Sequence, residues 1–493
     1  MKELSSLIAD LDYQRLQGDL TVEITGIAYD SRKVEAGEIF VCIDGFTQDG
    51  HNYIEEAIEN GAQALLVERE IEAPNWIPII KTADNRLALA VVSAEFYDHP
   101  SRKLKVVGVT GTNGKTTTTY LVNSILREAG YKSGLVGTIE NQIGDRNLET
   151  ERTTPEALDL QSLLAEMVEE GVTHVVMEVS SHALSLKRVN QIDFDIAIFT
   201  NITQDHLDFH DSLEEYLAAK RILFAELDDD EEKTAIINID DPYAEDILKS
   251  SRPATLTYSI EKDANLKARE ITISPTGVDF LAETANGELE LDLNLTGLFN
   301  VYNTLAALGV GIALGIDSDD IKAGLEKVEG VAGRFEIINE GQDFGVIVDY
   351  AHTPDSLENI LETAQDFVEG RIILVFGCGG DRDRTKRPLM GQIAMELADF
   401  SIITSDNPRS EDPQAIIDDI EVGIKEQGKI AKQDYLIIEE RRQAIRQGIE
   451  LAEAQDLVFI VGKGHETYQI LKDKTIPFDD RQVAREALAE LRG

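Results

Sequence analysis

A glycine-rich segment from Gly108 to Thr116, with the sequence Gly-Val-Thr-Gly-Thr-Asn-Gly-Lys-Thr, has the residue types needed to bind a phosphate chain. Glycines let backbone amides surround an anion, Lys115 adds a fixed positive charge, and the hydroxyl of Thr116 can reach Mg²⁺. The common form of this loop begins with a glycine where the present chain has Val109. Because an apolar run at 106–109 precedes the segment and a helical pattern at 117–129 follows it, we still expect a nucleotide triphosphate there. The expected contacts are Thr110, Gly111, Thr112, Asn113, Gly114, Lys115 and Thr116.

Acidic and imidazole side chains follow two further predicted strands. Glu178 ends the apolar run 175–177, and a polar group comes after the run 196–199, with members Asn201, Asp205, His206, Asp208 and His210. Ligands of wound parallel sheets collect at the carboxyl ends of strands, so we expect Glu178 to join Thr116 in holding Mg²⁺, which prefers oxygen ligands. In the second group, His206 is the better candidate for a further metal or phosphate contact. The alternatives are a solvated glutamate and a structural histidine.

Lys220 interrupts the apolar face of a predicted helix at 213–227. Leu213, Leu217, Phe224 and Leu227 lie on that face, and Lys220 takes the missing step. One explanation is that the amine reaches the surface while the stem stays buried. The other is that burial lowers the pKa of the amine, so that the neutral form reacts with carbon dioxide to give a carbamate able to bridge Mg²⁺ ions. The periodicity leaves both explanations open.

Three charged loops close successive predicted strands in the last third of the chain. Their sequences are Gly-Cys-Gly-Gly-Asp-Arg-Asp at 377–383, Asp-Asn-Pro-Arg at 406–409 and Gly-Lys-Gly-His-Glu at 462–466. Arginine binds a carboxylate with two parallel hydrogen bonds, and Asp, Asn and Glu accept hydrogen bonds from an ammonium group. Together the loops fit a free amino acid, although charged loops are often only solvated.

The elements that must position these residues indicate an α/β fold. At 493 residues the chain is long enough for about three domains. Residues 1–100 read as a small α/β domain. Residues 101–330 read as a central phosphate-loop domain with a wound, mostly parallel sheet, followed by an antiparallel-looking section between Ala254 and Leu295. Residues 331–493 read as a Rossmann-like domain. We expect a linker at 99–103 and hinges near residues 100 and 330.

Asp and Glu total 92 against 46 Lys and Arg, which gives a formal net charge of −46. Such a charge repels nucleic acid and anionic membrane surfaces, so neither is an expected partner. The acidic residues are spread along the whole chain, which suggests a source with high internal salt; undiminished stability at low salt would contradict this hypothesis. Two distant cysteines, no signal-peptide pattern and no run of about 18 apolar residues indicate a cytoplasmic protein without membrane insertion. We expect a monomer.

With these residues in view, the chain resembles the Mur ligases, the ATP-dependent amide-bond ligases of peptidoglycan precursor synthesis. The resemblance extends from Asp30-Ser-Arg32 through the phosphate loop to the C-terminal loops. It also includes Thr153-Thr-Pro155, Glu178-Val-Ser-Ser-His182, Asp205-His206, Ala218-Ala-Lys220, Asn300-Val-Tyr-Asn303, Gly333-Arg-Phe-Glu336 and Asp349-Tyr-Ala-His352. More narrowly, the Asp-Asn-Pro-Arg motif is similar to that of members that use meso-2,6-diaminopimelate.

The resemblance implies roles for individual residues. It implies that UDP-N-acetylmuramoyl-L-alanyl-D-glutamate is bound by Ser31, Thr153, Thr154, Ser180 and Arg188. It implies ATP and Mg²⁺ as cofactors, with Asn303, Arg334, Asp349 and His352 around the adenosine. Lys220 should be carbamylated, and Thr116, Glu178, His206 and Lys220 should hold Mg²⁺, with Lys115, Glu178, His206 and Lys220 taking part in catalysis. The diaminopimelate pocket should comprise Arg382, Asp406, Asn407, Pro408, Arg409, Gly462 and Glu466.

Forming an amide at neutral pH requires an activated carboxyl group, and phosphorylation by ATP to an acyl phosphate supplies the activation. The sequence leaves three alternatives: a lysine-adding member of the same family, a folylpolyglutamate synthetase, and a phosphate-loop switch or motor ATPase. The Asp-Ser-Arg and Asp-Asn-Pro-Arg motifs argue against the first two. The third would hydrolyse ATP without an amino acid.

Overall fold

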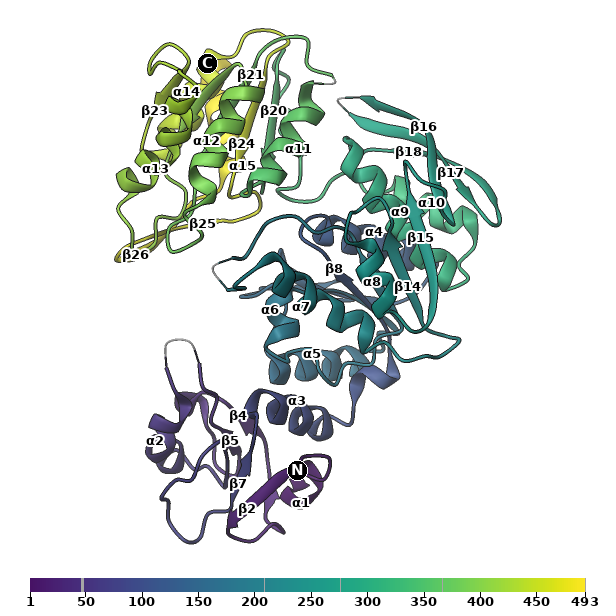
Figure 1. Ribbon diagram of the computed structural model, residues 1–493, viewed down its shortest axis with the longest axis vertical. Coiled ribbons are helices and arrows are strands. Elements are labelled where there is room, and N and C mark those ends of the chain that lie inside the picture. Colours follow the sequence, from purple (N-terminus) through teal and green to yellow (C-terminus); the bar gives the residue numbers. More distant parts are fainter. Residues whose placement is uncertain (46–47, 208, 275, 366, 493) are drawn as a thin grey trace. The chain divides into compact units, whose positions relative to one another are not determined.

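The computed structural model describes residues 1–45, 48–207, 209–274, 276–365 and 367–492. The chain is an α/β protein, as predicted, and forms two compact units (Figure 1). The first unit comprises Met1–Gly108, Tyr131–Ala197 and Ile222–Lys233, and the second comprises Val109–Gly130, Ile198–Arg221 and Thr234–Gly493. The predicted boundaries near residues 100 and 330, with their hinges, stay a prediction.

The N-terminal part of the first unit is built on a five-stranded sheet with the order β2-β7-β6-β5-β4, in which β2 alone is antiparallel to its neighbour. Alternate residues face opposite sides: Phe40 and Leu65 pack against α2, whereas Val41 and Leu66 pack against α3. The strands are β2 (Tyr13–Gln17), β4 (Ile27–Ala28), β5 (Ile39–Val41), β6 (Ala64–Val67) and β7 (Ile79–Thr82), beside the short pair β1 (Lys2–Glu3) and β3 (Glu23–Ile24). The helices are α1 (Leu4–Leu7), α2 (Ile54–Glu59) and α3 (Asn85–Phe96). The predicted linker forms a 3-10 turn at Pro100–Lys103.

An 11-stranded sheet has the order β11-β10-β9-β12-β8-β13-β14-β15-β16-β17-β18. Its strands are β8 (Lys105–Thr110), β9 (Ser133–Val136), β10 (Asn141–Ile143), β11 (Arg146–Leu148), β12 (His174–Glu178), β13 (Ile196–Phe199), β14 (Thr234–Asn238), β15 (Ala254–Ser259), β16 (Leu266–Ser274), β17 (Gly277–Thr284) and β18 (Gly287–Leu293). β16, β17 and β18 pair antiparallel, as predicted. The prediction was wrong for β15, which is parallel to both β14 and β16. The alternation of apolar and hydroxyl residues along β15 resembles an antiparallel strand, but its pairing with β14 is parallel.

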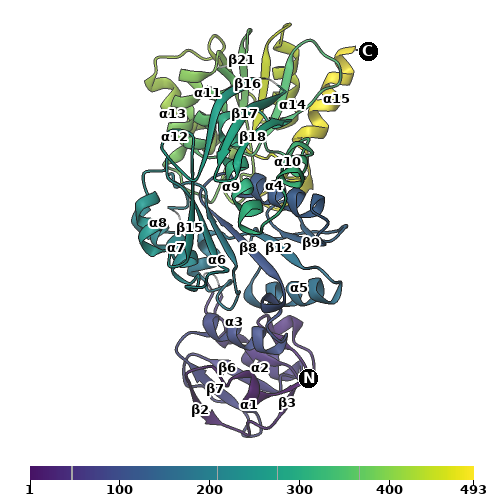
Figure 2. The same ribbon diagram turned by 90° about the vertical axis from the view of Figure 1, so that its right-hand side faces the viewer.

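Helices of this central part include α4 (Lys115–Glu128), which starts directly after the glycine-rich segment and ends before Gly130, as predicted. α10 (Ser318–Glu326) packs closely on α4, because a Cβ at Gly324 would lie 2.6 Å from the Cα of Ile125 (Figure 2). The other helices are α5 (Ala157–Glu169), α6 (Ser181–Ser185), α7 (Leu213–Ala225), α8 (Ala244–Ser250) and α9 (Leu298–Ala313). The predicted helix at 213–227 thus ends two residues early.

The C-terminal part is a six-stranded sheet between two helical layers, with the order β19-β20-β24-β21-β22-β23. Leu374 and Phe459 contribute to the core under α11, α12 and α13, whereas Val375 and Val458 contribute to the core under α14 and α15 (Figure 1). The strands are β19 (Glu336–Ile337), β20 (Gly345–Asp349), β21 (Ile372–Phe376), β22 (Phe400–Ile403), β23 (Tyr435–Ile437) and β24 (Leu457–Val461). The helices are α11 (Pro354–Gln365), α12 (Lys386–Leu397), α13 (Pro413–Glu426), α14 (Arg441–Leu451) and α15 (Asp480–Arg492), and a hairpin joins β25 (Tyr468–Leu471) to β26 (Lys474–Pro477). Apart from β19, which is antiparallel to β20, the sheet is parallel and covered on both faces, which agrees with the Rossmann-like prediction.

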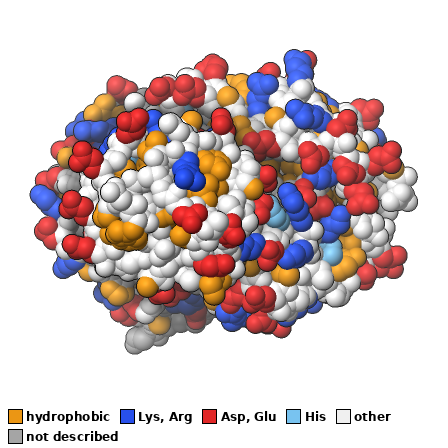
Figure 3. Space-filling view, turned by 90° about the horizontal axis from the view of Figure 1, so that it is seen from below, with side chains coloured by type: hydrophobic (Ala, Val, Ile, Leu, Met, Phe, Trp, Pro, Cys, Tyr) orange, Lys and Arg blue, Asp and Glu red, His pale blue; other side chains and the backbone are white. Residues whose placement is uncertain are grey.

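The surface carries side chains of both charges. Acidic and basic side chains lie interspersed on the face drawn in Figure 3. Among the described residues, no helix combines the length and apolar character needed to cross a bilayer.

Candidate active site

The glycine-rich segment forms a loop between β8 and α4 that only glycine permits at two points. Gly114 has φ +84°, and a Cβ there would lie 2.4 Å from Oδ1 of Asn303; a Cβ at Gly111 would lie 1.8 Å from Oγ1 of Thr200. Lys115 donates hydrogen bonds from Nζ to the backbone oxygens of Gly111 and Thr112 at 3.0 and 2.8 Å. The loop is therefore a cradle with a cation held over it, next to a helix N-terminus, which fits a phosphate chain.

Gly108, the glycine nearest the expected start of the loop, has a packing role. It lies inside β8, and a Cβ there would lie 2.7 Å from the ring of Phe194. Although Val109 stands where the common loop has its first glycine, both Gly111 and Gly114 are present, so the anion cradle at 111–114 is complete.

Arg334 lies beside the loop within the second unit. Its Nη2 donates to Oγ1 of Thr116 at 3.1 Å, and its guanidinium carbon lies 4.4 Å from the ring centroid of Tyr350. Asp349 accepts hydrogen bonds from the backbone N–H groups of Phe335 and Ala351, both at 2.6 Å, and burial raises the pKa of this carboxyl group despite the opposing charge of Arg334. Asn303 is buried and accepts from Thr118 at 3.4 Å. The structure thus brings Asn303, Arg334 and Asp349 close to the phosphate-binding loop.

The largely buried carboxylate of Asp205 lies near His206, His352 and Lys386. Burial by itself would raise its pKa, but the charges of His206, His352 and Lys386 lower it to about 2. Nε2 of His206 lies 3.4 Å from Oδ2 of Asp205, and His206 adopts φ +56°. Burial, with Lys386 adding to it, lowers the pKa of His352 to about 4, so His352 is neutral near pH 7. Asp208, another member of the predicted group, lies outside the described residues.

Lys220 is buried, with 1% of its surface exposed, which excludes the explanation that its amine reaches solvent. Nζ donates to the backbone oxygen of Gly111 at 2.7 Å and lies 4.3 Å from the ring centroid of Tyr216. Burial, with the nearby charge of Lys115, lowers the pKa of Lys220 well below its ordinary value. A neutral amine beside the phosphate-binding loop is the state that reacts with carbon dioxide.

Asn113 of the phosphate-binding loop and Thr203, which follows β13, both contact α11, and no pattern in the sequence pointed to these contacts. Asp355 accepts from Nδ2 of Asn113 at 2.7 Å and from Oγ1 of Thr203 at 3.1 Å. Asp355 is far from both in sequence, at the start of α11. Because these bonds lie within the second unit, they join its C-terminal part to the phosphate-binding loop.

A second cluster lies in the first unit and contains Glu178. Its carboxylate accepts from the backbone N–H of Thr138 at 2.8 Å and from Oγ1 of the same residue at 3.0 Å. Thr138 also contacts Thr153 at 3.0 Å, and Thr154 donates to the backbone oxygen of Glu178 at 2.8 Å. The predicted pairing of Glu178 with Thr116 stays a prediction.

Arg188 extends this second cluster. It donates to the backbone oxygen of Thr154 at 3.2 Å and pairs with Glu156 at 2.8 Å, and burial lowers the pKa of its guanidinium. Ser180 donates its backbone N–H to Oγ1 of Thr154 at 3.2 Å. The structure therefore brings Thr153, Thr154, Ser180 and Arg188 together. Ser31 lies elsewhere in the unit, where it donates to Glu56 at 2.5 Å.

The three charged loops of the C-terminal part converge, as their positions after neighbouring strands predicted. Nδ2 of Asn407 donates to Oε2 of Glu466 at 2.7 Å, and Nη1 of Arg409 donates to the backbone oxygen of Gly380 at 2.9 Å. A Cβ at Gly462 would lie 2.5 Å from Oδ2 of Asp406. Pro408 is buried beside these residues, whereas Arg382 is exposed and donates to the backbone oxygen of Asp381 at 3.0 Å.

Buried cations support the three loops, and sequence reasoning missed them. Arg387 is fully buried and donates to Glu411, Asp419 and the backbone oxygen of Gly379. Lys463 is fully buried against Asn407 and Glu466. A signal existed for Arg387, since it occupies a core position of α12 in the way that Lys220 does in α7.

The side chains around the phosphate-binding loop could hold Mg²⁺ only together with phosphate and water oxygens. Within the described ranges, no three His, Cys, Asp or Glu side chains are grouped closely enough to hold a metal ion by themselves. Mg²⁺ usually binds through one or two protein groups and keeps phosphate and water oxygens. The hydroxyl of Thr116 beside the phosphate cradle is one such group.

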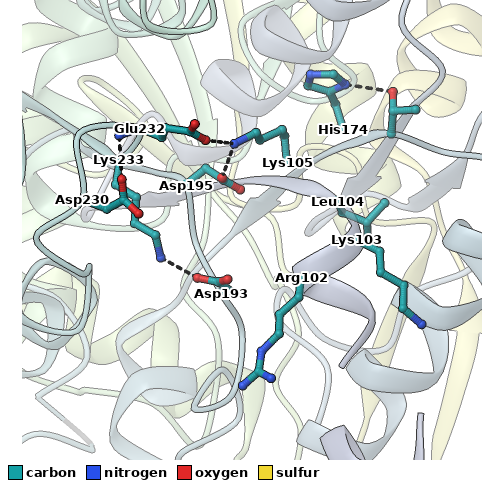
Figure 4. Close-up of a pocket in the computed structure, with 11 residues that line it drawn as sticks. Arg102, Lys103, Leu104, Lys105, His174, Asp193, Asp195, Asp230, Glu232 and Lys233 are labelled. Carbon is teal, nitrogen blue, oxygen red and sulfur yellow. Dashed lines mark hydrogen bonds and ion pairs between the residues drawn. The ribbon is translucent and has the colours of Figure 1, made fainter. Parts of the chain in front are cut away.

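A polar cavity lies at the other end of several strands. Its lining includes Lys105 at the start of β8, His174 at the start of β12 and Asp195 just before β13 (Figure 4). Lys105 donates to Asp195 at 2.9 Å and to Glu232 at 3.3 Å. Since Lys105 and Lys233 are already paired with carboxylates, this cavity reads as a network of ion pairs at the amino ends of the strands.

Comparison with known proteins identifies the class that this fold and these clusters define. Models of a Mur ligase family catalytic domain, a Mur ligase middle domain and a Mur ligase glutamate ligase domain match residues 23–101, 109–311 and 333–464. The chain belongs to the Mur ligase family, as the sequence motifs predicted.

Particular relatives are similar along their whole length. The UDP-N-acetylmuramoyl-L-alanyl-D-glutamate--2,6-diaminopimelate ligase of Syntrophomonas wolfei is 50% identical, over 99% of this chain and 99% of its own. The enzyme of the same name from Clostridium botulinum is 48% identical, over 99% and 100%. A solved structure of an enzyme with this name is 34% identical with a TM-score of 0.70, covering 100% of this chain and 99% of that one.

Proposed function

We propose that this protein is an ATP-dependent ligase that joins meso-2,6-diaminopimelate to the D-glutamate of UDP-N-acetylmuramoyl-L-alanyl-D-glutamate during peptidoglycan synthesis. The observation that carries the proposal is the presence, in one compact unit, of a phosphate-binding loop and of three converging loops with groups for an amino acid. The names of the relatives, at 48 to 50% identity over nearly the full chain, support this choice of substrates.

The chemistry has two steps. ATP phosphorylates the side-chain carboxylate of the D-glutamate, which gives an acyl phosphate and ADP; the neutral amine of diaminopimelate then attacks the acyl carbon, and phosphate leaves. Lys115 and the amides of 111–116 would stabilise the charge that develops on the transferring phosphoryl group. Asn303, Arg334, Asp349 and His352 would surround the adenosine. The stacking of Arg334 on Tyr350 and its bond to Thr116 support a role at the junction of base and phosphates.

Lys220 would act as a carbamate. Its neutral Nζ attacks carbon dioxide, a C–N bond forms and one proton is released, which converts a buried amine into an anion beside the loop. Thr116, Glu178, His206 and the carbamate would hold Mg²⁺. When bound, Mg²⁺ would polarise the phosphate oxygens and offset their charge.

The two substrates would bind in different clusters. Ser31, Thr153, Thr154, Ser180 and Arg188 would bind the UDP-muramyl dipeptide; the network around Thr154 supports this for all but Ser31. Arg409 would bind the second carboxylate of diaminopimelate, with Arg382, Asp406, Asn407, Pro408, Gly462 and Glu466 completing the pocket. L-lysine lacks that carboxylate, and leaving the half-buried guanidinium of Arg409 without its anion makes discrimination of roughly 10³-fold reachable.

Phosphate release measured with the UDP-muramyl dipeptide and each candidate amino acid tests the proposal. We expect release with meso-diaminopimelate, release at least about 10³-fold slower with L-lysine, and none without the dipeptide. Equal rates with both amino acids would indicate the lysine-adding alternative, and release without any amino acid would indicate a switch or motor ATPase.

A further inference from the structure

Lys463 is a charged residue to which the reaction assigns no role. None of its surface is exposed, although it lies in the loop between β24 and β25. Its Nζ donates to Oε2 of Glu466 at 2.8 Å and to Oδ1 of Asn407 at 3.2 Å. Burying an ammonium group is costly unless it is fully compensated, so this lysine is expected to serve its two partners.

The contacts of Asn407 fix the orientation of its amide. Oδ1 accepts from Lys463 and also from the backbone N–H of Ile470 at 2.9 Å. Two donors on one side require the oxygen there, so Nδ2 points to Glu466 and donates to it at 2.7 Å. An amide has two N–H donors, and only one of them is used in this contact, which leaves the second for an acceptor on a ligand.

Both hydrogen bonds to the carboxylate of Glu466 go to the same oxygen. Oε2 accepts from both Lys463 and Asn407, and within the described part of the chain no hydrogen bond reaches Oε1. A carboxylate held in this way keeps one oxygen for an ammonium group. One lysine thus fixes a donor for a carboxylate and an acceptor for an ammonium, the two groups of an amino acid.

We propose that Lys463 is the positioning residue of the amino-acid pocket, holding Glu466 and Asn407 in the orientation that binds the zwitterionic end of the incoming amino acid. The inference rests on the proposed function. Lys463 contacts no reacting atom and acts through these two side chains. Its removal should therefore weaken binding of the amino acid and leave the nucleotide and dipeptide sites unchanged.

Steady-state kinetics of Lys463→Met test this, with each substrate varied in turn. We expect the KM for meso-diaminopimelate to rise about 10- to 100-fold, from the loss of two charge-assisted hydrogen bonds, while the KM values for ATP and the dipeptide stay within about twofold. Lys463→Gln keeps one donor of similar reach and should give a smaller rise. If Lys463→Met does not fold, the Gln variant decides. Lys233→Met, which removes another buried, ion-paired lysine, is the matched control and should leave all three KM values unchanged.

A double-mutant cycle separates positioning from general support. In a Glu466→Gln background, Lys463→Met should raise the KM for diaminopimelate by a smaller factor than in the wild type, because the charge of one of its two partners is already gone and only the contact with Asn407 is left to lose. Equal effects of Lys463→Met in both backgrounds, or an unchanged KM in the single variant, would overturn the inference. If the wild-type protein instead uses no diaminopimelate at all, the proposed function fails before the variants are compared.

Discussion

Lys220 donates a hydrogen bond from Nζ to the backbone oxygen of Gly111 at 2.7 Å, which joins α7 to the phosphate-binding loop inside the protein. The contact places an amine with a lowered pKa next to the position expected for the nucleotide. Structural stability alone does not explain it, because an apolar side chain would avoid the cost of burying an ammonium group.

We therefore expect Lys220→Met to lower the rate of phosphate release by about 10²- to 10³-fold without lowering the melting temperature. The wild-type protein in ¹³C-labelled bicarbonate should give a carbamate carbon signal that the variant lacks. Lys249→Met, on the neighbouring helix α8, removes an exposed lysine and should match the wild type in both measurements. An active Lys220→Met variant would refute a catalytic role for this side chain.

Gly114 in the phosphate-binding loop and Gly130 after the end of α4 have similar backbone conformations but different surroundings. Gly114 has φ +84° and Gly130 has φ +81°, but a Cβ would meet Asn303 only at Gly114, since nothing lies within 4 Å at Gly130. Both alanine variants should lose about 1 to 2 kcal/mol from the left-handed conformation. We expect Gly114→Ala to raise the KM for ATP at least about tenfold in addition, through displacement of the loop. Equal KM values for the two variants would show that the close approach to Asn303 has no bearing on nucleotide binding.

Local patterns predicted the parts of the site that lie within one element or just after it. The anion cradle follows from Gly, Lys and Thr between a strand and a helix. The step of Lys220 in the apolar face of α7 placed its stem on the buried side but left the burial of its amine open. Both depend on residues a few positions apart. The strand β13 was predicted with its exact bounds, 196–199, because its apolar run is buried on both faces.

The rest depends on contacts that no local pattern encodes. The pKa of Asp205 is lowered first by His206, its neighbour in sequence, but also by His352 and Lys386, which come from the C-terminal part of the chain. Asp355 reaches Asn113 across 242 positions of sequence. β10 and β11 are short strands without an apolar run, so they were missed. Their pairing with β9 is recognisable only once the strand order is known.

A fully buried ion pair supports the end of β24, directly before the Gly462 loop. Arg441 at the start of α14 and Asp480 at the start of α15 have no exposed surface; they share two hydrogen bonds of 2.8 and 2.6 Å, and Arg441 also donates to the backbone oxygen of Val461 at 2.9 Å. Arg441→Met should lower the free energy of unfolding by about 3 to 5 kcal/mol, because Asp480 is left buried without a partner.

Urea denaturation measures this loss. The double variant Arg441→Met, Asp480→Leu should recover most of it, since neither charge remains. Arg446→Met breaks an ion pair with Glu490 between the same two helices at the surface, and it should cost less than about 1 kcal/mol. Losses of equal size for Arg441→Met and Arg446→Met would contradict the role assigned to burial.

His352 should make the protein less stable in mild acid. Burial, reinforced by the charge of Lys386, lowers its pKa to about 4, whereas a histidine in an unfolded chain titrates near about 6.5. Between these values the unfolded state binds more protons than the folded state, so the contribution of this group to stability falls as the pH falls from 6.5 towards 4 and is constant above that window. His352→Gln removes the titrating group. Between pH 6.5 and 4.5 the variant should therefore lose about 2 kcal/mol less of its free energy of unfolding than the wild type. Urea denaturation at these two pH values measures the difference, and the same measurement at pH 8 gives the effect of the substitution itself. Equal losses of free energy of unfolding in the two proteins would show that His352 is protonated in the folded state as readily as in the unfolded state.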